Sequence, residues 1–457
     1  MIGVVVSRAD EASVAIGDAL TETGAWAVRT DESRPDGAGG GEYYRATDAP
    51  VELRWFDDLH LDLTHPEAAF TDPDAVVFAS RHSGDTGPLL TCHPTGNFGP
   101  AEYGGRDRAF APAAPGLQRA LVAGFDAHAP ADYAVGIECT HHGPTEVAVP
   151  SIFAELGSSE SAWRDPEGAR AVARAIRELP DRDATPAVGD PADPRHLLGV
   201  GDGHYAPRFE RILRETPWGV GHVAADWQLD ELGDPATHAD TLARAADASD
   251  ARFAVFAGDY PAVHEALPAD VRVVSETWVR EVGDRPLDRV ERLEREVTTV
   301  AEGLRFGDRR SDAWTVRPLP AAAVETALGV DADATRRAVA AHTVAFEAAE
   351  NGTRPAGRGA FPDDSTDSTD STDGGSSDAT DTDEPTAIPA YDALIDALAE
   401  VLRDRYETVE RRDGELVAER TAFDPAAAAE AGVPEGPKFG KLANGQPVEV
   451  DGERVDP

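Results

Sequence analysis

Residues 76–99 have the sequence VVFASRHSGDTGPLLTCHPTGNFG, a short apolar run followed by polar and reactive side chains. The first four residues predict a buried strand, and the Ser, Arg, His, Asp and Thr residues that follow are types that a packed core excludes. The same order recurs at residues 133–145, 196–209 and 218–226, where an apolar segment again leads into a His-containing loop. If these strands are parallel neighbours, their loops meet at one edge of the sheet, where open α/β sheets bind ligands.

Strands and helices alternate along the first 285 residues. Ile2–Val6 and Tyr133–Ile137 are expected strands, and Asp10–Thr23 and Leu117–Ala127 are expected helices. This alternation predicts an α/β fold with a mostly parallel mixed sheet and helices on both faces. The predicted organisation is a catalytic α/β domain (1–285), an Ala-rich helical extension (286–362), a disordered acidic Ser/Thr/Asp linker (363–386) and a small C-terminal region (387–457).

The charge balance is strongly acidic. The 457 residues include 85 acidic and 42 basic side chains, a net charge of −43, and the two lysines are Lys438 and Lys441. This composition is typical of proteins adapted to high salt, where a Debye length of about 3 Å at 1 M screens carboxylate repulsion. Phosphate contacts are then confined to local Arg clusters, and molar salt removes most of the gain from counterion release. If the protein binds nucleic acid, we therefore expect shape recognition and contacts with bases to contribute more of the binding free energy than phosphate contacts do.

Two cysteines are too few for a disulfide framework, so a reduced, cytoplasmic protein is expected. No apolar stretch approaches the ~20 residues of a membrane span, so no membrane partner is expected.

The strand-end loops gather imidazole, thiol and carboxylate groups, which suit Zn²⁺. Spacing alone makes no metal assignment, because no HExxH or CxxC pair is present. Cys92 and Cys139 also fit small buried hydrophobes, His222 fits a hydrogen-bonded core histidine, and His93 fits a turn cap. P-loop, GxGxxG and GxSxG motifs are missing, which argues against ATP, nicotinamide and serine-hydrolase chemistry. The full candidate set is His82, Asp85, Cys92, His93, Glu138, Cys139, His141, His142, Asp202, His204 and His222.

Four segments carry a family resemblance. Ser80–Gly84 (SRHSG), Thr91–Asn97 (TCHPTGN), Gly136–Pro144 (GIECTHHGP) and Gly201–Tyr205 (GDGHY) resemble, in sequence and order, the archaeal and plant type of D-aminoacyl-tRNA deacylase, here with the composition of a haloarchaeal form. The resemblance covers roughly residues 1–285. It implies hydrolysis of the ester between a D-amino acid and the 3′ end of tRNA, which recycles mischarged tRNA. It also implies two zinc ions per chain and a core similar to peptidyl-tRNA hydrolases and nucleoside phosphorylases.

The four His-bearing strand ends and the needs of ester hydrolysis give expectations for the roles of the site residues. Zinc chemistry supplies an activated water, and the metal, Arg81 or loop amides stabilise the oxyanion. A small wall such as Gly143–Pro144 excludes the side chain of an L-amino acid. Which residues ligate metal and which act as base stays open. The expected catalytic residues are Arg81, Glu138, His141 and His142, the expected metal ligands are His82, His93, Glu138, His141 and His204, and the expected substrate contacts are Ser83, Gly84, Gly143, Pro144, Thr145 and Tyr205.

Two other classes of function compete with this interpretation. One is a peptidyl-tRNA hydrolase-like or phosphorylase-like enzyme on the same fold. The other is a non-catalytic tRNA-binding protein that uses arginines of residues 164–177 and the turn at Lys438–Lys441. The clustered imidazoles argue against the second, because RNA binders need Arg, Lys and exposed aromatic residues. A monomer with D-aminoacyl-tRNA as its substrate is expected.

Overall fold

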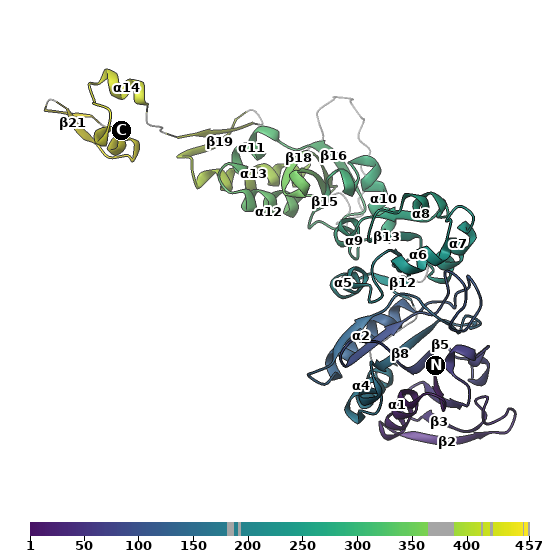
Figure 1. Cartoon of the computed structure of the whole chain (residues 1–457). Coiled ribbons are helices and arrows are strands. Elements are labelled where there is room, and N and C mark those ends of the chain that lie inside the picture. Colours follow the sequence, from purple (N-terminus) through teal and green to yellow (C-terminus); the bar gives the residue numbers. More distant parts are fainter. Residues whose placement is uncertain are drawn as a thin grey trace, which may run out of the picture. The chain divides into compact units, whose positions relative to one another are not determined.

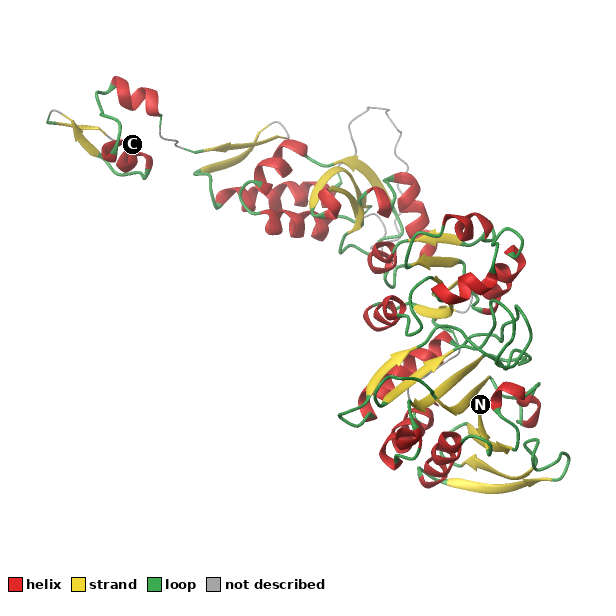
Figure 2. Cartoon of the chain, viewed as in Figure 1, coloured by secondary structure: helices red, strands yellow, loops and turns green. Residues whose placement is uncertain are grey.

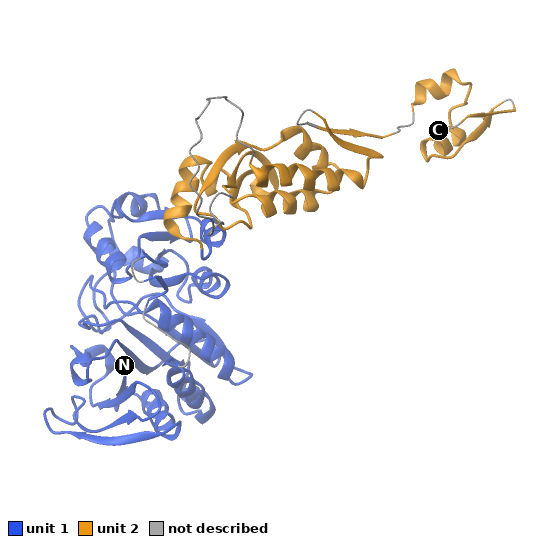
Figure 3. Cartoon of the chain, turned by 180° about the vertical axis from the view of Figure 1, so that it is seen from behind, with its two compact units in different colours: residues 1–284 blue, residues 285–457 orange. Residues whose placement is uncertain are grey.

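The computed structural model describes residues 1–180, 187–190, 193–363, 388–412, 415–420, 424–450 and 452–455. These residues form two compact units, Met1–Asp284 and Arg285–Pro457, shown in blue and orange in Figure 3. The predicted linker, 363–386, lies outside the described residues except for Asp363.

The first unit is built on an eight-stranded mixed sheet with the strand order β2-β3-β4-β1-β5-β8-β6-β7 (Figure 1). The four central strands, β4, β1, β5 and β8, are parallel, whereas β6 runs antiparallel to β8 and parallel to β7. The α/β class and the mixed sheet predicted from the sequence are confirmed. The bounds are β1 (Ile2–Ser7), β2 (Trp26–Asp31), β3 (Gly41–Ala46), β4 (Val51–Phe56), β5 (Ala75–Arg81), β6 (Leu89–His93), β7 (Ala134–Ile137) and β8 (Ser151–Gly157).

Three helices cover one face of this sheet, with α4 packed between the other two. They are α1 (Glu11–Glu22), α2 (Pro115–His128) and α4 (Pro166–Arg177). Asp10 caps α1 by accepting hydrogen bonds from the backbone N–H groups of Ala12 and Ser13, which fixes where the helix starts.

The opposite face of the sheet carries a different set of side chains. Leu156 of β8 lies under α4, and side chains alternate between faces along a strand, so Phe153 and Glu155 point to the other side. There Phe153 stacks on Phe78 of β5 at a ring-centroid distance of 4.7 Å. His60 packs edge-on against both rings. The 3₁₀-helices η1 (His60–Asp62) and η2 (Pro66–Ala69) and long loops cover this face.

A second, fully parallel sheet follows in the same unit, with the order β12-β11-β13-β14. The predicted strands around residues 196–200 and 219–224 therefore do not share a sheet edge with β5, and the expectation of one common edge is corrected. Local sequence pattern cannot reveal this, because sheet membership is decided by long-range pairing. The bounds are β11 (His196–Val200), β12 (Gly219–Ala224), β13 (Phe253–Phe256), β14 (Arg272–Val274), α5 (Pro207–Glu215), α6 (Asp226–Leu232), α7 (Ala239–Ala248), α8 (Pro261–Ala266) and α9 (Glu276–Val282).

The segment after β7 joins the two sheets. The N–H of Cys139 donates to the carbonyl of His204 (2.8 Å), and the N–H of Thr140 donates to the carbonyl of Val223 (3.0 Å). The segment that follows β7 of the first sheet is therefore bonded to the loop after β11 and to β12 of the second sheet. This junction replaces the single edge that the sequence predicted.

The second unit contains an antiparallel sheet with the order β15-β17-β18-β16 and helices packed against it (Figure 2). The prediction of a helical extension over 286–362 is corrected, because this segment also contains the four strands of that antiparallel sheet. Strands such as RPAGRGAFP lack the alternation that marks a strand in sequence. The bounds are α10 (Leu287–Glu296), β15 (Leu304–Phe306), β16 (Trp314–Pro318), α11 (Ala321–Leu328), α12 (Ala332–His342), β17 (Ala345–Ala349), β18 (Arg354–Pro362), α13 (Pro389–Arg403), β19 (Thr408–Arg412), β20 (Glu415–Glu419), α14 (Pro425–Glu430), α15 (Pro437–Ala443), β21 (Val448–Val450) and β22 (Glu453–Val455). None of the helices in the described part of the chain has the length and apolar character that a bilayer span requires.

Candidate active site

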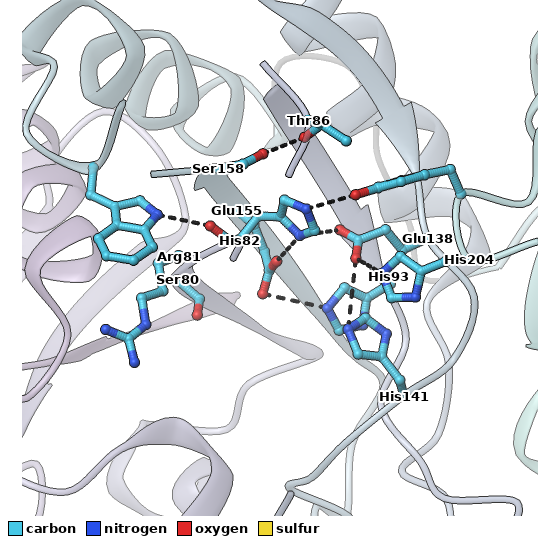
Figure 4. Close-up of polar contacts among 12 residues, drawn as sticks. Ser80, Arg81, His82, Thr86, His93, Glu138, His141, Glu155, Ser158 and His204 are labelled. Atoms are coloured by element: carbon cyan, nitrogen blue, oxygen red, sulfur yellow. Dashed lines mark hydrogen bonds and ion pairs between the residues drawn. The ribbon is translucent and has the colours of Figure 1, made fainter. Parts of the chain in front are cut away.

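The imidazoles of separate chain segments converge on the carboxylate of Glu138, which is fully buried. Its Oε2 lies 2.7 Å from Nε2 of His204 and 3.7 Å from Nε2 of His141, and its Oε1 lies 3.2 Å from Nδ1 of His82 (Figure 4). These residues come from the loops after β7, β11 and β5. Three loops from two sheets therefore supply one cluster.

A second buried carboxylate, Glu155 of β8, completes the cluster. Its oxygens lie 3.6 Å from Nδ1 of His82 and 3.4 Å from Nε2 of His93. Glu155 pairs in register with Ser80 of β5 and Thr91 of β6, which places it between the two histidine-bearing strand ends. Glu155 is not among the residues predicted from the sequence, because it lies inside a strand rather than at a strand end. The available signal was one acid in the otherwise apolar strand SIFAELG, since buried acids are rare unless paired.

Three histidines are held in one tautomer. Nδ1 of His93, His141 and His142 lies 3.1, 2.9 and 2.7 Å from the backbone carbonyls of Pro94, Cys139 and Gly143, respectively. A carbonyl only accepts, so Nδ1 carries a proton in each ring, and in the neutral form of the ring Nε2 keeps its lone pair. The three rings pack together, with centroids 4.1 Å apart for His93 and His141 and 4.4 Å for His141 and His142. This is the arrangement in which metal-binding proteins hold their histidine ligands.

The donor atoms fit metal ions. Two groups share no residue, His93–His141–His142 and His82–Glu138–His204, and within each group the ligand atoms lie within 4.8 Å of one another. Two overlapping groups add Cys139 and Glu155. The buried atoms His93 Nε2 and Glu138 Oε1 make no well-formed hydrogen bond within the described residues, as expected of atoms directed at an ion. Nitrogen and carboxylate oxygen in groups of three suit catalytic zinc.

Burial and charge set the protonation states of the metal-free cluster. Burial opposes the charged form of Glu138, but the neighbouring imidazoles of His204 and His82 hold its pKa well below the usual range. Burial also works against the charged form of His82, yet Glu138 and Glu155 raise its pKa to about 11. Burial, with the neighbouring His93, lowers the pKa of His142 to about 4 and that of His141 well below its ordinary value. His141 and His142 are therefore neutral at pH 7, the form that binds metal.

A cavity of about 380 Å³ opens onto this cluster. His82, His141, His142, Glu155 and His204 line it together with apolar side chains such as Phe98 and Phe153. Arg81 is the one Arg or Lys among its lining residues in the described part of the chain, and its guanidinium lies 5.2 Å from the ring centre of Trp163. An apolar cavity with a polar, ionisable floor has the composition expected of a site for a small reacting group.

The predicted substrate contacts fall into two sets. Ser83 lines the cavity, and Tyr205 places its hydroxyl 3.1 Å from Nε2 of His82. At Gly84, a Cβ would lie 3.1 Å from that same nitrogen. The set formed by Gly143, Pro144 and Thr145 packs against the turn at residues 103–106 and is not among the cavity-lining residues.

Other members of the candidate set lie outside the cluster. His222 is buried with Nδ1 3.0 Å from the Thr140 hydroxyl and Nε2 3.0 Å from the Ala111 carbonyl, as expected of a core histidine. Cys92 points to the face covered by α2, with its sulfur 3.9 Å from the Gln118 carbonyl. Asp202 accepts hydrogen bonds from the N–H groups of Gly203 and Arg208. These three residues have structural roles, and Asp85 is exposed on the loop between β5 and β6.

The candidate RNA-binding arginines are also engaged in the fold. Arg164 pairs with Glu11, and Arg177, which is almost fully buried, pairs with Asp48 and stacks on Trp26. These contacts favour the structural alternative for both residues.

Comparison with known proteins completes this picture. The model of the D-aminoacyl-tRNA deacylase family matches residues 69–263, which hold every residue of the cluster. The chain is 50% identical to a D-aminoacyl-tRNA deacylase of Halorubrum lacusprofundi, over all of this chain and 94% of the relative. It is 47% identical to that of Haloarcula marismortui, over all of this chain and 97% of the relative. The crystal structure of a conserved protein of unknown function matches 61% of this chain and 96% of its own, with 27% identity and a TM-score of 0.52. The chain therefore belongs to the D-aminoacyl-tRNA deacylase family.

Proposed function

We propose that this chain hydrolyses the ester bond of D-aminoacyl-tRNA, releasing a free D-amino acid and tRNA, in the cavity above Glu138 and Glu155. Family membership over the full chain supports the substrate class. The observation that carries the chemistry is the convergence of five imidazoles and two carboxylates, of which His82, His141, His142, His204 and Glu155 line this cavity.

Two zinc ions fit the two groups that share no residue. His93, His141 and His142 would hold one ion through Nε2, and His82, Glu138 and His204 would hold the other. When bound, zinc in such a site supplies polarisation of an ester carbonyl and of water. Tyr205 supports this assignment, because its hydroxyl contacts Nε2 of His82 and leaves Nδ1 directed at Glu138.

Glu155 is the proposed proton carrier. It lines the cavity, while both of its oxygens face histidines on the metal side. Its carboxylate accepts a proton from the attacking water and returns it to the ribose 3′ oxygen as the ester bond breaks. Atoms and charge then balance without any further co-reactant.

Arg81 is the proposed stabiliser of the oxyanion. It ends β5 directly before His82 and brings a permanent positive charge to the cavity wall. Stacking on Trp163 restricts its guanidinium without neutralising it. A cation that is already positioned at the site before the reaction lowers the barrier to forming a tetrahedral intermediate.

The test compares three substrates at molar salt, D-Tyr-tRNA, L-Tyr-tRNA and N-acetyl-L-Tyr-tRNA, with and without a chelator. Cleavage of the first alone, lost with chelator and restored by zinc, supports the proposal. Cleavage of the N-acetylated substrate would instead favour a peptidyl-tRNA hydrolase, and binding without turnover of any substrate would favour a tRNA-binding protein. Light scattering of the same preparation tests the expected monomer.

A further inference from the structure

Two aromatic rings are exposed at the catalytic cavity. Among the described residues, three large hydrophobic side chains are exposed: Val28 (52%), Tyr103 (68%) and Trp227 (40%). Val28 lies on β2, but Tyr103 and Trp227 both line the cavity. Exposed aromatic rings are costly to leave in water, and their joint occurrence at one cavity points to a ligand with flat faces.

The turn that carries Tyr103 is firmly built. The next two residues, Gly104 and Gly105, adopt φ values of 81° and 77°, which favour glycine. The side-chain amide of Asn97 donates to the carbonyls of Gly104 (3.0 Å) and Arg106 (3.2 Å). The hydroxyl of Thr145 accepts from the N–H of Arg106 at 2.9 Å, and the N–H of Gly143 donates to the Tyr103 carbonyl at 3.0 Å.

Both Asn97 and Thr145 are buried, so their polar groups are committed to holding this turn. Asn97 belongs to the TCHPTGN segment and Thr145 belongs to the Gly143–Thr145 run. Neither residue takes part in the proposed chemistry. The segments that supply His93 and His142 therefore also fix the backbone that presents the Tyr103 ring.

Trp227 is tied to the cluster from the other sheet. It lies in the first turn of α6, and its side chain interacts with the thiol of Cys139. That sulfur lies 3.7 Å from Nδ1 of His204. The Cys139 thiol thus connects Trp227 to a proposed metal ligand, while two-fifths of the surface of Trp227 stays exposed.

We propose that Tyr103 and Trp227 form a stacking subsite for the nucleobases at the 3′ end of the substrate tRNA, with the terminal adenine as the main ligand. This inference rests on the proposed function, because the scissile ester is attached to the ribose of that nucleotide. A base one ribose away from the reacting carbonyl must lie at the wall or mouth of the cavity. Single-stranded nucleic acids are commonly bound by stacking of bases on aromatic rings.

The charge around the two rings favours a base over a phosphate. Glu102 precedes Tyr103, Glu231 lies one helical turn after Trp227, and both acids line the cavity. Burial, together with Glu102, raises the pKa of Glu231, as expected of two carboxylates that repel each other. A phosphate is repelled by such a surface, whereas a neutral base is not. Stacking also survives the molar salt for which this acidic composition is suited, in contrast to phosphate contacts.

The direct test places 2-aminopurine at the terminal position of uncharged tRNA and follows its fluorescence at molar salt. Wild-type protein should quench the probe as the base stacks, and Tyr103→Leu and Trp227→Leu should weaken the quench. Both variants should also raise KM for D-aminoacyl-tRNA by roughly 5- to 150-fold, the effect expected for losing one base stack. Bound zinc and the melting temperature are measured in parallel, so that loss of fold or of metal is recognised.

Two controls are matched to these variants. Tyr103→Phe restores the ring that Tyr103→Leu removes and should recover the quench. Val28→Ala changes an exposed hydrophobic residue that is not among the cavity-lining residues, and it should leave the quench and the KM at their wild-type values. Wild-type protein without quench, or Tyr103→Leu with unchanged quench and KM, overturns the subsite. Failure of wild-type protein to cleave D-aminoacyl-tRNA overturns the proposed function instead, and the fluorescence titration separates these two outcomes because it needs no turnover.

Discussion

Glu138 Oε2 lies 2.7 Å from Nε2 of His204, which joins the segment after β7 in the first sheet to the loop after β11 in the second. Since Glu138 is fully buried, its charge must be compensated by these imidazoles or by an ion. The two sheets are therefore held together at the site by the same side chains that the chemistry requires.

Glu138→Gln is expected to release about one zinc ion per chain and to lower deacylation at least about 100-fold, because an amide is a poor metal ligand. Elemental analysis and turnover on D-Tyr-tRNA check this. Glu167→Gln, an exposed acid in the first turn of α4, serves as the control and should retain both. Wild-type zinc content in Glu138→Gln would remove Glu138 from the ligand set.

His141→Ala and His142→Ala should each weaken metal binding by the group His93–His141–His142, because both residues present Nε2 toward His93. The expected result is a lower zinc content in each variant together with loss of turnover. The matched control is His196→Gln, which changes a buried histidine of β11 whose Nδ1 is bonded to the Ser249 carbonyl. Equal zinc in the control and in His141→Ala would contradict the assignment.

Metal removal should destabilise the fold as well as abolish activity. Without an ion, the cluster leaves His93 Nε2 and Glu138 Oε1 buried and poorly satisfied. A ligand that binds only the folded state stabilises it by mass action, so the melting temperature should fall with a chelator and recover with zinc. Differential scanning fluorimetry at constant molar salt measures this, with Mg²⁺ as the control ion. Identical melting curves in all three conditions would mean that no structural metal is bound.

The sequence predicted the parts of the site that lie on strand-end loops. His82, Glu138, His141 and His204 stand in Gly- or Pro-containing loops where a packed core gives no reason for imidazole or carboxylate, so the chemistry was visible locally. His93 at the end of β6 was found in the same way. The α/β class was equally visible, because it depends on the order of local elements.

The remainder depended on long-range pairing. Glu155 lies inside a strand, and its role appears only when β8 is placed between β5 and β6 in register. The split into two sheets depends on β11 pairing with β13 rather than with a strand of the first sheet. The choice between His93 and its neighbour Cys92 depends on which face of β6 is covered by α2. None of these facts is encoded in the spacing of residues along the chain.

His222 provides a pH dependence that is separate from catalysis. Burial lowers its pKa to about 4, against an ordinary value near 6.5. The unfolded chain therefore binds more protons between these values, so stability is complete above about pH 6.5 and falls as the pH drops toward 4. From pH 7 to pH 5 this group should remove about 2 kcal/mol from the free energy of unfolding.

His222→Gln should abolish that contribution, because the amide can still bond the Ala111 carbonyl and does not titrate. Denaturant unfolding at pH 7 and pH 5 in the same molar salt measures the difference. His65→Gln, a change to an exposed histidine, is the control and should keep the wild-type pH dependence. If His222→Gln loses as much stability as the wild type between the two pH values, another group is responsible.

Glu155→Gln separates a proton carrier from a metal ligand. The amide keeps the shape of the side chain and its place between His82 and His93, but it cannot accept a proton from water. If Glu155 carries the proton, kcat should fall by about 10²- to 10⁴-fold while both zinc ions and KM are retained, since general base catalysis contributes that range. Single-turnover deacylation together with elemental analysis of the same sample makes the comparison. Loss of zinc in Glu155→Gln would place this carboxylate among the ligands and leave the proton with another residue of the cluster.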